Sequence, residues 1–230
     1  MKIGGLIKTS LVDYPGKVAC SIFTIGCNFR CGFCHNPELV DPIRYIQEIP
    51  EELVFEFLEK RKDNLDGVAI SGGEPTVQPD LAKFLRRVKK LGLLVKLDSN
   101  GSNPDVLEDL FGQNLVDFIA MDVKGPIEKY ESIMGWPAGA KCKRSIDLIL
   151  ASGISHEFRT TVVKGMLEVE DFEEVGQLVQ GAERFALQHF RAIPEMVNTE
   201  EYKDAKTFTE GEFEQARKIM ARYVKKVVVH

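Results

Sequence analysis

The feature that most constrains the fold is a regular alternation of short apolar segments with segments of helical periodicity. The first apolar segment, residues 17–26, is rich in small, β-branched and aromatic residues and is apolar on both faces, as strands covered on both sides are. Strands are predicted at 17–26, 66–71, 94–98, 117–124, 156–163 and 188–193, and helices at 79–91, 104–111, 127–134, 144–151 and 171–187, with a helix opening after Pro50 and another at Thr209. Residues 227–230 form one more strand or a docked end.

Strands that alternate with helices predict parallel βαβ units. Right-handed crossovers between such strands allow either an open sheet or a barrel-like curl. No linker and no low-complexity segment interrupts the 230 residues, a length that is ordinary for a single α/β core. We therefore expect one domain over residues 1–230.

The composition limits the class of protein. Hydrophobic residues make up 44% and charged residues 28% of the chain, as in soluble globular proteins. A net charge of -5 without a long basic run argues against general nucleic-acid binding. The chain contains no apolar run approaching the ~18 residues of a membrane span, and its first residues do not form a secretory signal. Clustered cysteines fit a reducing compartment, so we expect a cytoplasmic protein with no membrane partner.

Three of the five cysteines, Cys27, Cys31 and Cys34, lie within eight residues in a C-x3-C-x2-C pattern directly after the first predicted strand. Cysteines at this spacing indicate metal or redox chemistry. Structural zinc and iron–sulfur clusters usually take four protein ligands. Cys20 or His35 could supply a fourth ligand, which keeps zinc open. Alternatively, the fourth position stays open for chemistry.

Further polar motifs follow the next three predicted strands. Gly72-Gly73-Glu74 follows the second, residues 98–101 (Asp-Ser-Asn-Gly) follow the third, and Asp122 and Lys124 end the fourth. Because working residues in parallel α/β folds follow the carboxyl ends of the strands, we expect these motifs at one rim with the cysteines. Glycines allow close approach of a ligand to the backbone. Asp122 and Lys124 are two apart in a predicted strand, so they project from the same face.

Together, the cysteine pattern after the first strand and Gly-Gly-Glu after the second resemble the motifs of radical S-adenosylmethionine (SAM) enzymes. The resemblance covers nearly the whole chain and implies a partial (β/α)6 TIM-like barrel with parallel strands and the cluster loop after the first strand. It implies a [4Fe-4S] cluster held by three cysteines, with SAM chelating the fourth iron through its amino and carboxylate groups. Reductive cleavage of SAM would then give methionine and a 5′-deoxyadenosyl radical that abstracts hydrogen.

The resemblance assigns expected roles to individual residues. Cys27, Cys31 and Cys34 would be the cluster ligands, and the backbone of Phe33 would lie near the adenine. The SAM-binding set would comprise Phe33, Gly72, Gly73, Glu74, Asp98, Asn100, Asp122 and Lys124. Gly72, Gly73 and Glu74 would receive the amino group, and Lys124 would pair with the carboxylate.

The resemblance also allows a monovalent cation held by Asp98 and Asp122. Purely structural readings stand beside these roles. Phe33 could be ordinary packing, Asn100 could form an Asx turn, and Asp122 with Lys124 could be an isolated ion pair.

Within this superfamily, residues 10–17 (Ser-Leu-Val-Asp-Tyr-Pro-Gly-Lys) and 27–39 look like those of anaerobic ribonucleoside-triphosphate reductase activating proteins. That likeness implies an activase that places a radical on a glycine of a partner enzyme and takes electrons from a flavodoxin- or ferredoxin-type donor. Two alternatives remain open. One is a radical SAM enzyme acting on a small molecule, similar to 7-carboxy-7-deazaguanine synthase. The other is a non-catalytic zinc or iron–sulfur module.

Overall fold

The computed structural model describes residues 1–230, and the chain forms two compact units. The first unit comprises Met1–Asn28, Asn36–Ser99 and Asp105–Ile119, and the second comprises Phe29–His35, Asn100–Pro104 and Ala120–His230. The strands follow the order of the chain, β1 to β8. The expected parallel α/β architecture of partial-barrel type is confirmed. None of the helices has the length and apolar character needed to cross a membrane.

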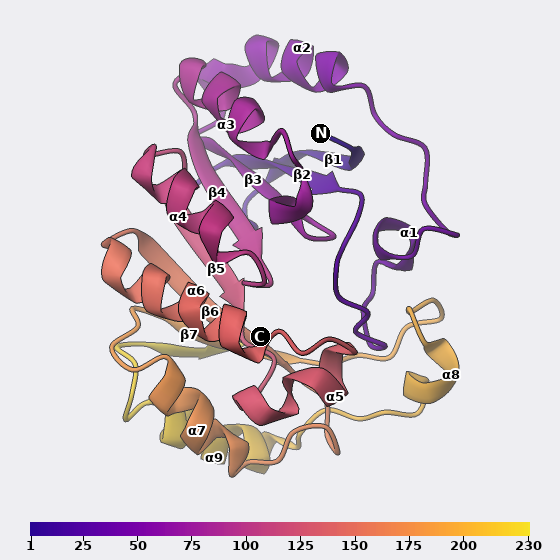
Figure 1. The fold of residues 1–230 in the computed structure, drawn as a ribbon, viewed down its shortest axis with the longest axis vertical. Coiled ribbons are helices and arrows are strands. Elements are labelled where there is room, and N and C mark those ends of the chain that lie inside the picture. The colour runs from indigo at the N-terminus through magenta and orange to yellow at the C-terminus, as the bar shows by residue number, and fades with distance from the viewer. The chain divides into compact units, whose positions relative to one another are not determined.

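Most of the first unit is four strands with helices between them (Figure 1). The elements are β1 (Ile3–Ser10), β2 (Ala19–Thr24), α1 (Pro37–Val40), α2 (Glu51–Arg61), β3 (Gly67–Gly72), α3 (Leu81–Lys90), β4 (Leu94–Ser99) and α4 (Pro104–Gly112). β2, β3 and β4 are parallel neighbours, with Cys20 opposite Val68 and Val68 opposite Val95. β1 was not predicted, and it pairs antiparallel with β2. The cysteine loop therefore follows the second strand of the chain, which is the first parallel one.

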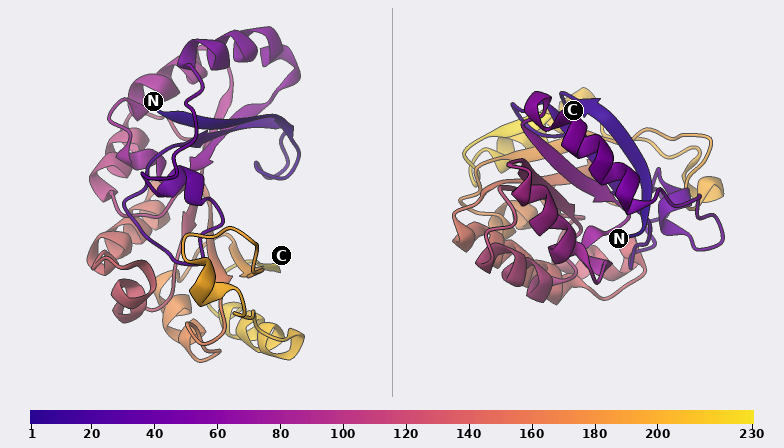
Figure 2. Two further views of the ribbon diagram at one scale, coloured as in Figure 1. Left: turned by 90° about the vertical axis from the view of Figure 1, so that its right-hand side faces the viewer. Right: turned by 90° about the horizontal axis from the view of Figure 1, so that it is seen from above.

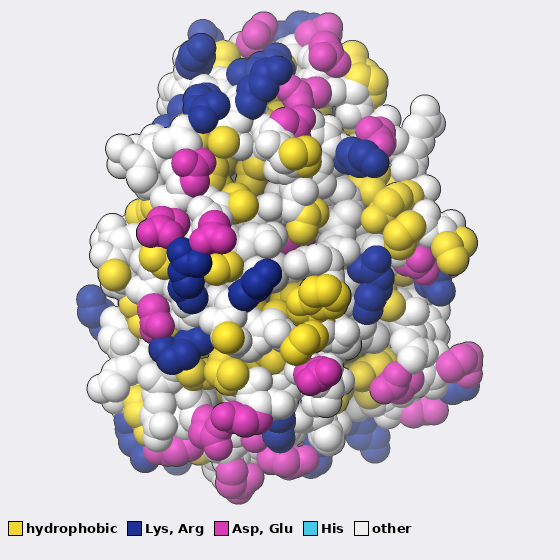
Figure 3. Space-filling model, in the orientation of Figure 1, with side chains coloured by type: hydrophobic (Ala, Val, Ile, Leu, Met, Phe, Trp, Pro, Cys, Tyr) yellow, Lys and Arg dark blue, Asp and Glu magenta, His cyan; other side chains and the backbone are white.

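The core of the first unit lies where α2 and α3 pack on the parallel strands. Ile22, Ile70 and Leu97 are fully buried in three successive strands, and each such side chain contributes about 1.5–3 kcal/mol through burial. The rings of Phe55 in α2 and Phe84 in α3 lie 4.9 Å apart between centroids. The outer faces of α2 and α3 carry Lys and Arg side chains interspersed with Asp and Glu (Figure 3).

The second unit repeats the strand–helix pattern and contains three parallel strands. Its elements are α5 (Tyr130–Met134), α6 (Gly139–Ser152), β6 (Ser155–Val162), α7 (Asp171–Leu178), β7 (Phe185–His189), α8 (Thr199–Tyr202), α9 (Glu210–Met220) and β8 (Val227–Val229). β5 (Phe118–Asp122) contributes residues to both units. α7 lies beside α9, as Figures 1 and 2 both show. The predicted capping box of Thr209 and Glu212 is present at the start of α9.

Several boundaries in the second unit differ from those predicted; for example, α6 begins at Gly139 instead of residue 144, and β7 ends at His189 instead of residue 193. The helix predicted over 171–187 ends at Leu178, and β7 starts at Phe185 instead of residue 188. Val179 and Ala182 continue the helical spacing and are fully buried, but the backbone turns at Gly181, whose φ is +89°. Gly181 has the left-handed conformation that commonly ends a helix. The apolar periodicity therefore ran past the end of the helix.

Candidate functional site

The three cysteines of the motif lie in the loop after β2, and all are free thiols. Cys27 belongs to the first unit, and Cys31 and Cys34 belong to the second. Cys31 is buried, while Cys27 and Cys34 are half-buried. Free thiols so close in the chain fit the donor set expected for the cluster. The structure contains no group of three or more His, Cys, Asp and Glu side chains that could hold a single metal ion. The ligand role of the cysteines therefore stays a prediction.

Backbone hydrogen bonds hold the part of the cysteine loop that belongs to the second unit. The Cys34 N–H donates to the Cys31 carbonyl at 3.0 Å, which forms a tight turn. The segment before α8 adds two more bonds, because the Asn198 N–H donates to Gly32 (2.8 Å) and the Val197 N–H donates to Cys34 (3.1 Å). Backbone groups bonded in this way resist local opening. The loop thus holds Cys31 and Cys34 in a fixed turn.

Phe33 lies between these two cysteines, and its side chain is part of a buried aromatic cluster. Its ring makes edge-to-face contacts with Phe190 and Tyr202, at centroid distances of 6.4 and 6.0 Å. A Cβ on Gly32 would lie only 2.5 Å from the Tyr202 ring. Packing therefore explains the Phe33 side chain, in agreement with the structural reading of this residue. The role of the Phe33 backbone near an adenine remains a prediction.

The glycines of Gly72-Gly73-Glu74 have a structural cause within the first unit. Gly72 has φ +107°, and a Cβ at this position would lie 2.3 Å from the backbone nitrogen of Thr24. A Cβ on Gly73 would lie 2.1 Å from the carbonyl oxygen of Gly26. The Gly73 N–H donates to the Thr24 carbonyl at 2.9 Å. The loop after β3 can therefore pass this close to the end of β2 only without side chains at these two positions.

Replacing Gly72 with alanine is expected to destabilise the protein by about 2–3 kcal/mol, because φ is positive and backbone atoms block the new methyl group. Urea unfolding measures the change. Gly211→Ala in α9 is the matched control, since a methyl group at that position would meet nothing within 4 Å beyond its chain neighbours and the backbone of its own helix, and alanine favours helix by up to about 1 kcal/mol. Equal stability of Gly72→Ala and the wild type would contradict the steric argument.

Glu74 is almost fully buried, and its carboxylate links two loops of the first unit. Its Oε1 accepts hydrogen bonds from the Thr76 N–H (3.1 Å), the Thr76 hydroxyl (2.5 Å) and the Ser99 hydroxyl (2.9 Å). Ser99 ends β4, so Glu74 fixes the loop after β3 to the end of the neighbouring strand. Buried carboxylates need such partners to offset the loss of hydration. Glu74 therefore has a positioning role besides the proposed contact with an amino group.

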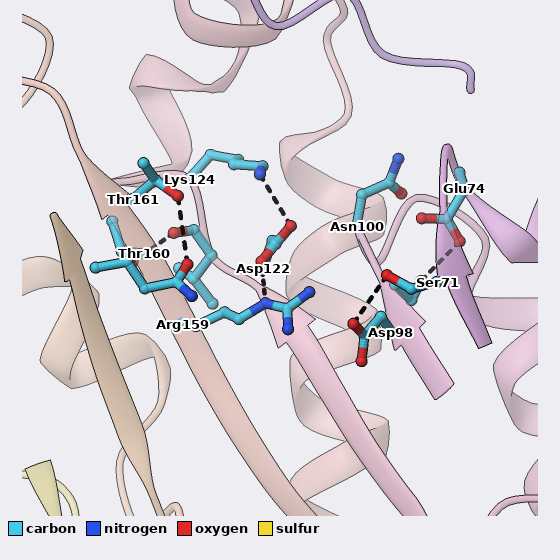
Figure 4. Close-up of polar contacts among 12 residues, drawn as sticks. Ser71, Glu74, Asp98, Asn100, Asp122, Lys124, Arg159, Thr160 and Thr161 are labelled. Carbon is cyan, nitrogen blue, oxygen red and sulfur yellow. Dashed lines mark hydrogen bonds and ion pairs between the residues drawn. The ribbon is translucent and has the colours of Figure 1, made fainter. Parts of the chain in front are cut away.

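Asp98, near the carboxyl end of β4, is paired with a residue that was not predicted as part of the site. Lys96 lies two residues earlier on the same face of β4, and its Nζ forms an ion pair with Asp98 Oδ1. The Ser71 hydroxyl, from the end of β3, donates to Asp98 Oδ2 at 3.0 Å (Figure 4). The side chain of Lys96 is only 5% exposed and that of Asp98 13%. A lysine in the otherwise apolar stretch 94–97 was the signal that could have revealed this pair.

Asn100 and Gly101 form the turn that one reading of the sequence predicted. Asn100 Oδ1 accepts from the Ser102 N–H at 2.9 Å, which is an Asx turn, and Gly101 has φ +74°. The loop is also bonded to α6, where Ser145 donates to the Gly101 carbonyl at 2.7 Å and the Cys142 thiol to the Asn100 carbonyl at 3.4 Å. These contacts explain Asn100 without a ligand. Its predicted part in SAM binding stays untested.

In the second unit, Asp122 is held between two cationic side chains. Lys124 Nζ donates to Asp122 Oδ2 at 3.0 Å, and Arg159 Nε from β6 donates to Oδ1 at 2.6 Å (Figure 4). β5 ends at Asp122, so Lys124 lies in the following loop and not in the strand as predicted. The Lys124 N–H donates to the Tyr130 hydroxyl at 3.3 Å. Asp122 and Lys124 nevertheless come together as the sequence spacing predicted.

The cationic neighbours decide the charge of this group. Burial alone would raise the pKa of Asp122, but the charges of Arg159 and Lys124 outweigh burial and hold that pKa well below its ordinary value. Burial alone would lower the pKa of Lys124, whereas Asp122 raises it above its ordinary value. Both groups therefore stay charged at neutral pH. Burial raises the pKa of the Cys31 thiol to about 11, so metal binding at Cys31 would release a proton.

Comparison with known proteins identifies the family. The model of the Radical SAM superfamily matches residues 21–179, which include the cysteine loop, Gly72-Gly73-Glu74, residues 98–101 and Asp122 with Lys124. The chain belongs to the radical SAM superfamily. It is thus an enzyme of the class that uses a [4Fe-4S] cluster and SAM, and the reading as a non-catalytic zinc or scaffold module is not supported.

Individual relatives and structures agree with this family. A Methanocaldococcus jannaschii protein, named for the activation of glycyl-radical enzymes, is 33% identical over 99% of this chain and 95% of its own length. A pyruvate formate-lyase-activating enzyme of Listeria monocytogenes is 33% identical over 49% of each chain. A 7-carboxy-7-deazaguanine synthase of Methanopyrus kandleri is 32% identical over 44% of this chain and 47% of its own. SuiB of Streptococcus suis, solved with bound SAM, shares the fold with a TM-score of 0.69 at 15% identity over 90% of this chain and 51% of its own.

Proposed function

We propose that this radical SAM enzyme activates a glycyl-radical enzyme by abstracting hydrogen from the Cα of a backbone glycine in its partner. The main support is a relative that is named for this activity. It is 33% identical to this chain, and the match covers 95% of the relative's length. The partner we propose is an anaerobic ribonucleoside-triphosphate reductase. Residues 10–17 and 27–39 support this choice, because they are similar to those of its activating proteins.

We assign the cluster to Cys27, Cys31 and Cys34, and SAM to the set of Phe33, Gly72, Gly73, Glu74, Asp98, Asn100, Asp122 and Lys124. When bound, the cluster and SAM supply the one-electron chemistry that produces a hydrogen-abstracting radical. The protein contributes binding and orientation. Lys124 would pair with the carboxylate of SAM. Asp122, which Arg159 holds in place, orients the Lys124 ammonium.

We propose that residues 1–230 act as a single radical SAM domain. Electrons would come from a flavodoxin- or ferredoxin-type donor. The clustered free thiols favour a reducing location such as the cytoplasm.

The experiment that tests the proposal is electron paramagnetic resonance of a mixture of reduced enzyme, SAM and the candidate reductase under anaerobic conditions. We expect a glycine-centred doublet on the reductase that requires SAM. A reductase variant with alanine in place of the radical-bearing glycine is the matched control and should give no doublet. SAM cleavage without a doublet on the reductase would contradict this choice of partner.

A small-molecule enzyme is the second candidate, because the 7-carboxy-7-deazaguanine synthase relative matches 44% of the chain. Activation of a glycyl-radical enzyme requires a protein substrate, whereas this alternative requires multiple turnovers of a small molecule. Efficient turnover of such a molecule, with no doublet on any protein partner, would favour the second candidate.

A further inference from the structure

We propose that Lys96 takes the place of the monovalent cation that the family resemblance allows beside Asp98, so that this enzyme binds SAM without such an ion. The inference rests on the proposed SAM-binding role of Asp98 and Asp122, and it does not depend on the partner enzyme.

The first observation is the ion pair in the first unit. Lys96 and Asp98 alternate with apolar residues in β4 and project from the same face. The Lys96 ammonium bonds to Asp98 Oδ1, and the Ser71 hydroxyl bonds to Oδ2. Lysine is almost never this buried without a partner. Its four-carbon stem therefore places the terminal nitrogen at the carboxylate that a cation would use.

The second observation concerns the other carboxylate predicted to bind the ion. Both oxygens of Asp122 in the second unit accept hydrogen bonds from cationic groups, Oδ1 from Arg159 and Oδ2 from Lys124. Each of the two carboxylates thus has at least one cationic partner, and three cationic side chains serve two carboxylates. The charge that a bound ion would supply is already built into the chain.

The chemistry of the donors points the same way. A hard cation needs several oxygen ligands in its coordination shell, while these carboxylate oxygens are engaged by N–H and O–H donors. A cation bound at Asp98 would lie close to the Lys96 ammonium, and electrostatic repulsion between the two positive charges would weaken its binding. In the second unit, two cationic side chains flank the single carboxylate of Asp122, and this excess of cationic groups suits the one anionic group of the methionine moiety of SAM, its carboxylate. The residues present therefore do not fit a monovalent cation.

The wild-type protein provides the first test. The cluster-loaded enzyme should bind SAM, measured by isothermal titration calorimetry, with dissociation constants that agree within about twofold in potassium chloride and in tetramethylammonium chloride at equal ionic strength. Binding that weakens by more than about tenfold without potassium or sodium would overturn the inference. Absence of SAM binding in both salts would instead overturn the proposed site itself.

Lys96→Met provides the second test, because it keeps most of the side-chain volume and removes the charge. The variant should bind SAM at least about tenfold more weakly in tetramethylammonium chloride, and potassium or sodium should restore part of that loss. Its thermal unfolding midpoint should also rise with potassium. Independence of both quantities from the cation would overturn the inference.

Two further variants distinguish the loss of the Lys96 charge from a general loss of stability. Lys89→Met removes a lysine that is paired with Asp117 in the same unit, and it should show no response to potassium. Lys96→Met/Asp98→Asn removes the carboxylate as well, so its unfolding midpoint should no longer respond to potassium. A potassium response that persists in the double variant would place the ion elsewhere and contradict the role of Lys96.

Discussion

Replacing Cys31 with alanine is expected to abolish assembly of the complete cluster. Cys31 is the middle cysteine of the motif, and its thiol is buried in the turn closed by the bond from the Cys34 N–H to its carbonyl. Alanine leaves one iron without its protein ligand, and no spare cysteine lies in the loop. After anaerobic reconstitution, iron analysis should fall from about four irons per chain to a small residual value, and the visible absorption of the cluster should be lost.

Cys20→Ala is the matched control for this prediction. Cys20 lies in β2 and is completely buried, and burial raises the pKa of its thiol to about 12. It behaves as a small apolar side chain, so the variant should keep its full iron content if it folds. A complete, reducible cluster in Cys31→Ala, or loss of the cluster only in Cys20→Ala, would contradict the ligand assignment.

Replacing Lys124 with alanine is expected to weaken SAM binding by roughly 10–100-fold while the cluster stays intact. The Lys124 side chain is 12% exposed and its ammonium is fixed by Asp122. A charge-assisted hydrogen bond to the SAM carboxylate contributes about 1.5–3 kcal/mol, and each 1.4 kcal/mol changes the dissociation constant about tenfold. Calorimetric titration of the reconstituted variant with SAM measures the change.

Lys129→Ala controls for the loss of a lysine from the same unit. Lys129 pairs with Asp171 at 2.6 Å, outside the proposed site, and its removal should leave SAM affinity unchanged. Because Asp122 stays ionised and Lys124 stays protonated around neutral pH, this pair should add no pH dependence to SAM binding between about pH 6 and 9. Unchanged affinity in Lys124→Ala would remove Lys124 from the site.

The sequence predicted those features that depend on local pattern. The strands β2 to β6 were recognised as short apolar segments, and α2, α3 and α4 by their helical periodicity. The polar motifs follow β2 to β5. β1 was missed because its residues Ile3 to Ser10 mix glycines with exposed polar residues. Its pairing with β2 is a tertiary interaction that a strand pattern does not show.

Contacts between segments that are distant in the chain could not be predicted from the sequence either. The bonds from Val197 and Asn198 to the cysteine loop join residues about 160 positions apart, which no local spacing reveals. Arg159 belongs to none of the sequence motifs, and its bond to Asp122, 37 residues away in the chain, forms only where the ends of β5 and β6 meet. Lys96 was overlooked, although a lysine within an apolar strand needs a charged partner and Asp98 lies two residues later on the same face.

The most direct test of the central claim is electron paramagnetic resonance of the reduced, reconstituted enzyme with and without SAM. If Cys27, Cys31 and Cys34 hold a cluster whose remaining iron is open to SAM, the addition of SAM should change the g-values of the reduced cluster. Lys124→Ala should need more SAM for the same change. A protein that binds zinc without iron, or a reduced cluster whose spectrum is identical with and without saturating SAM, would contradict the account.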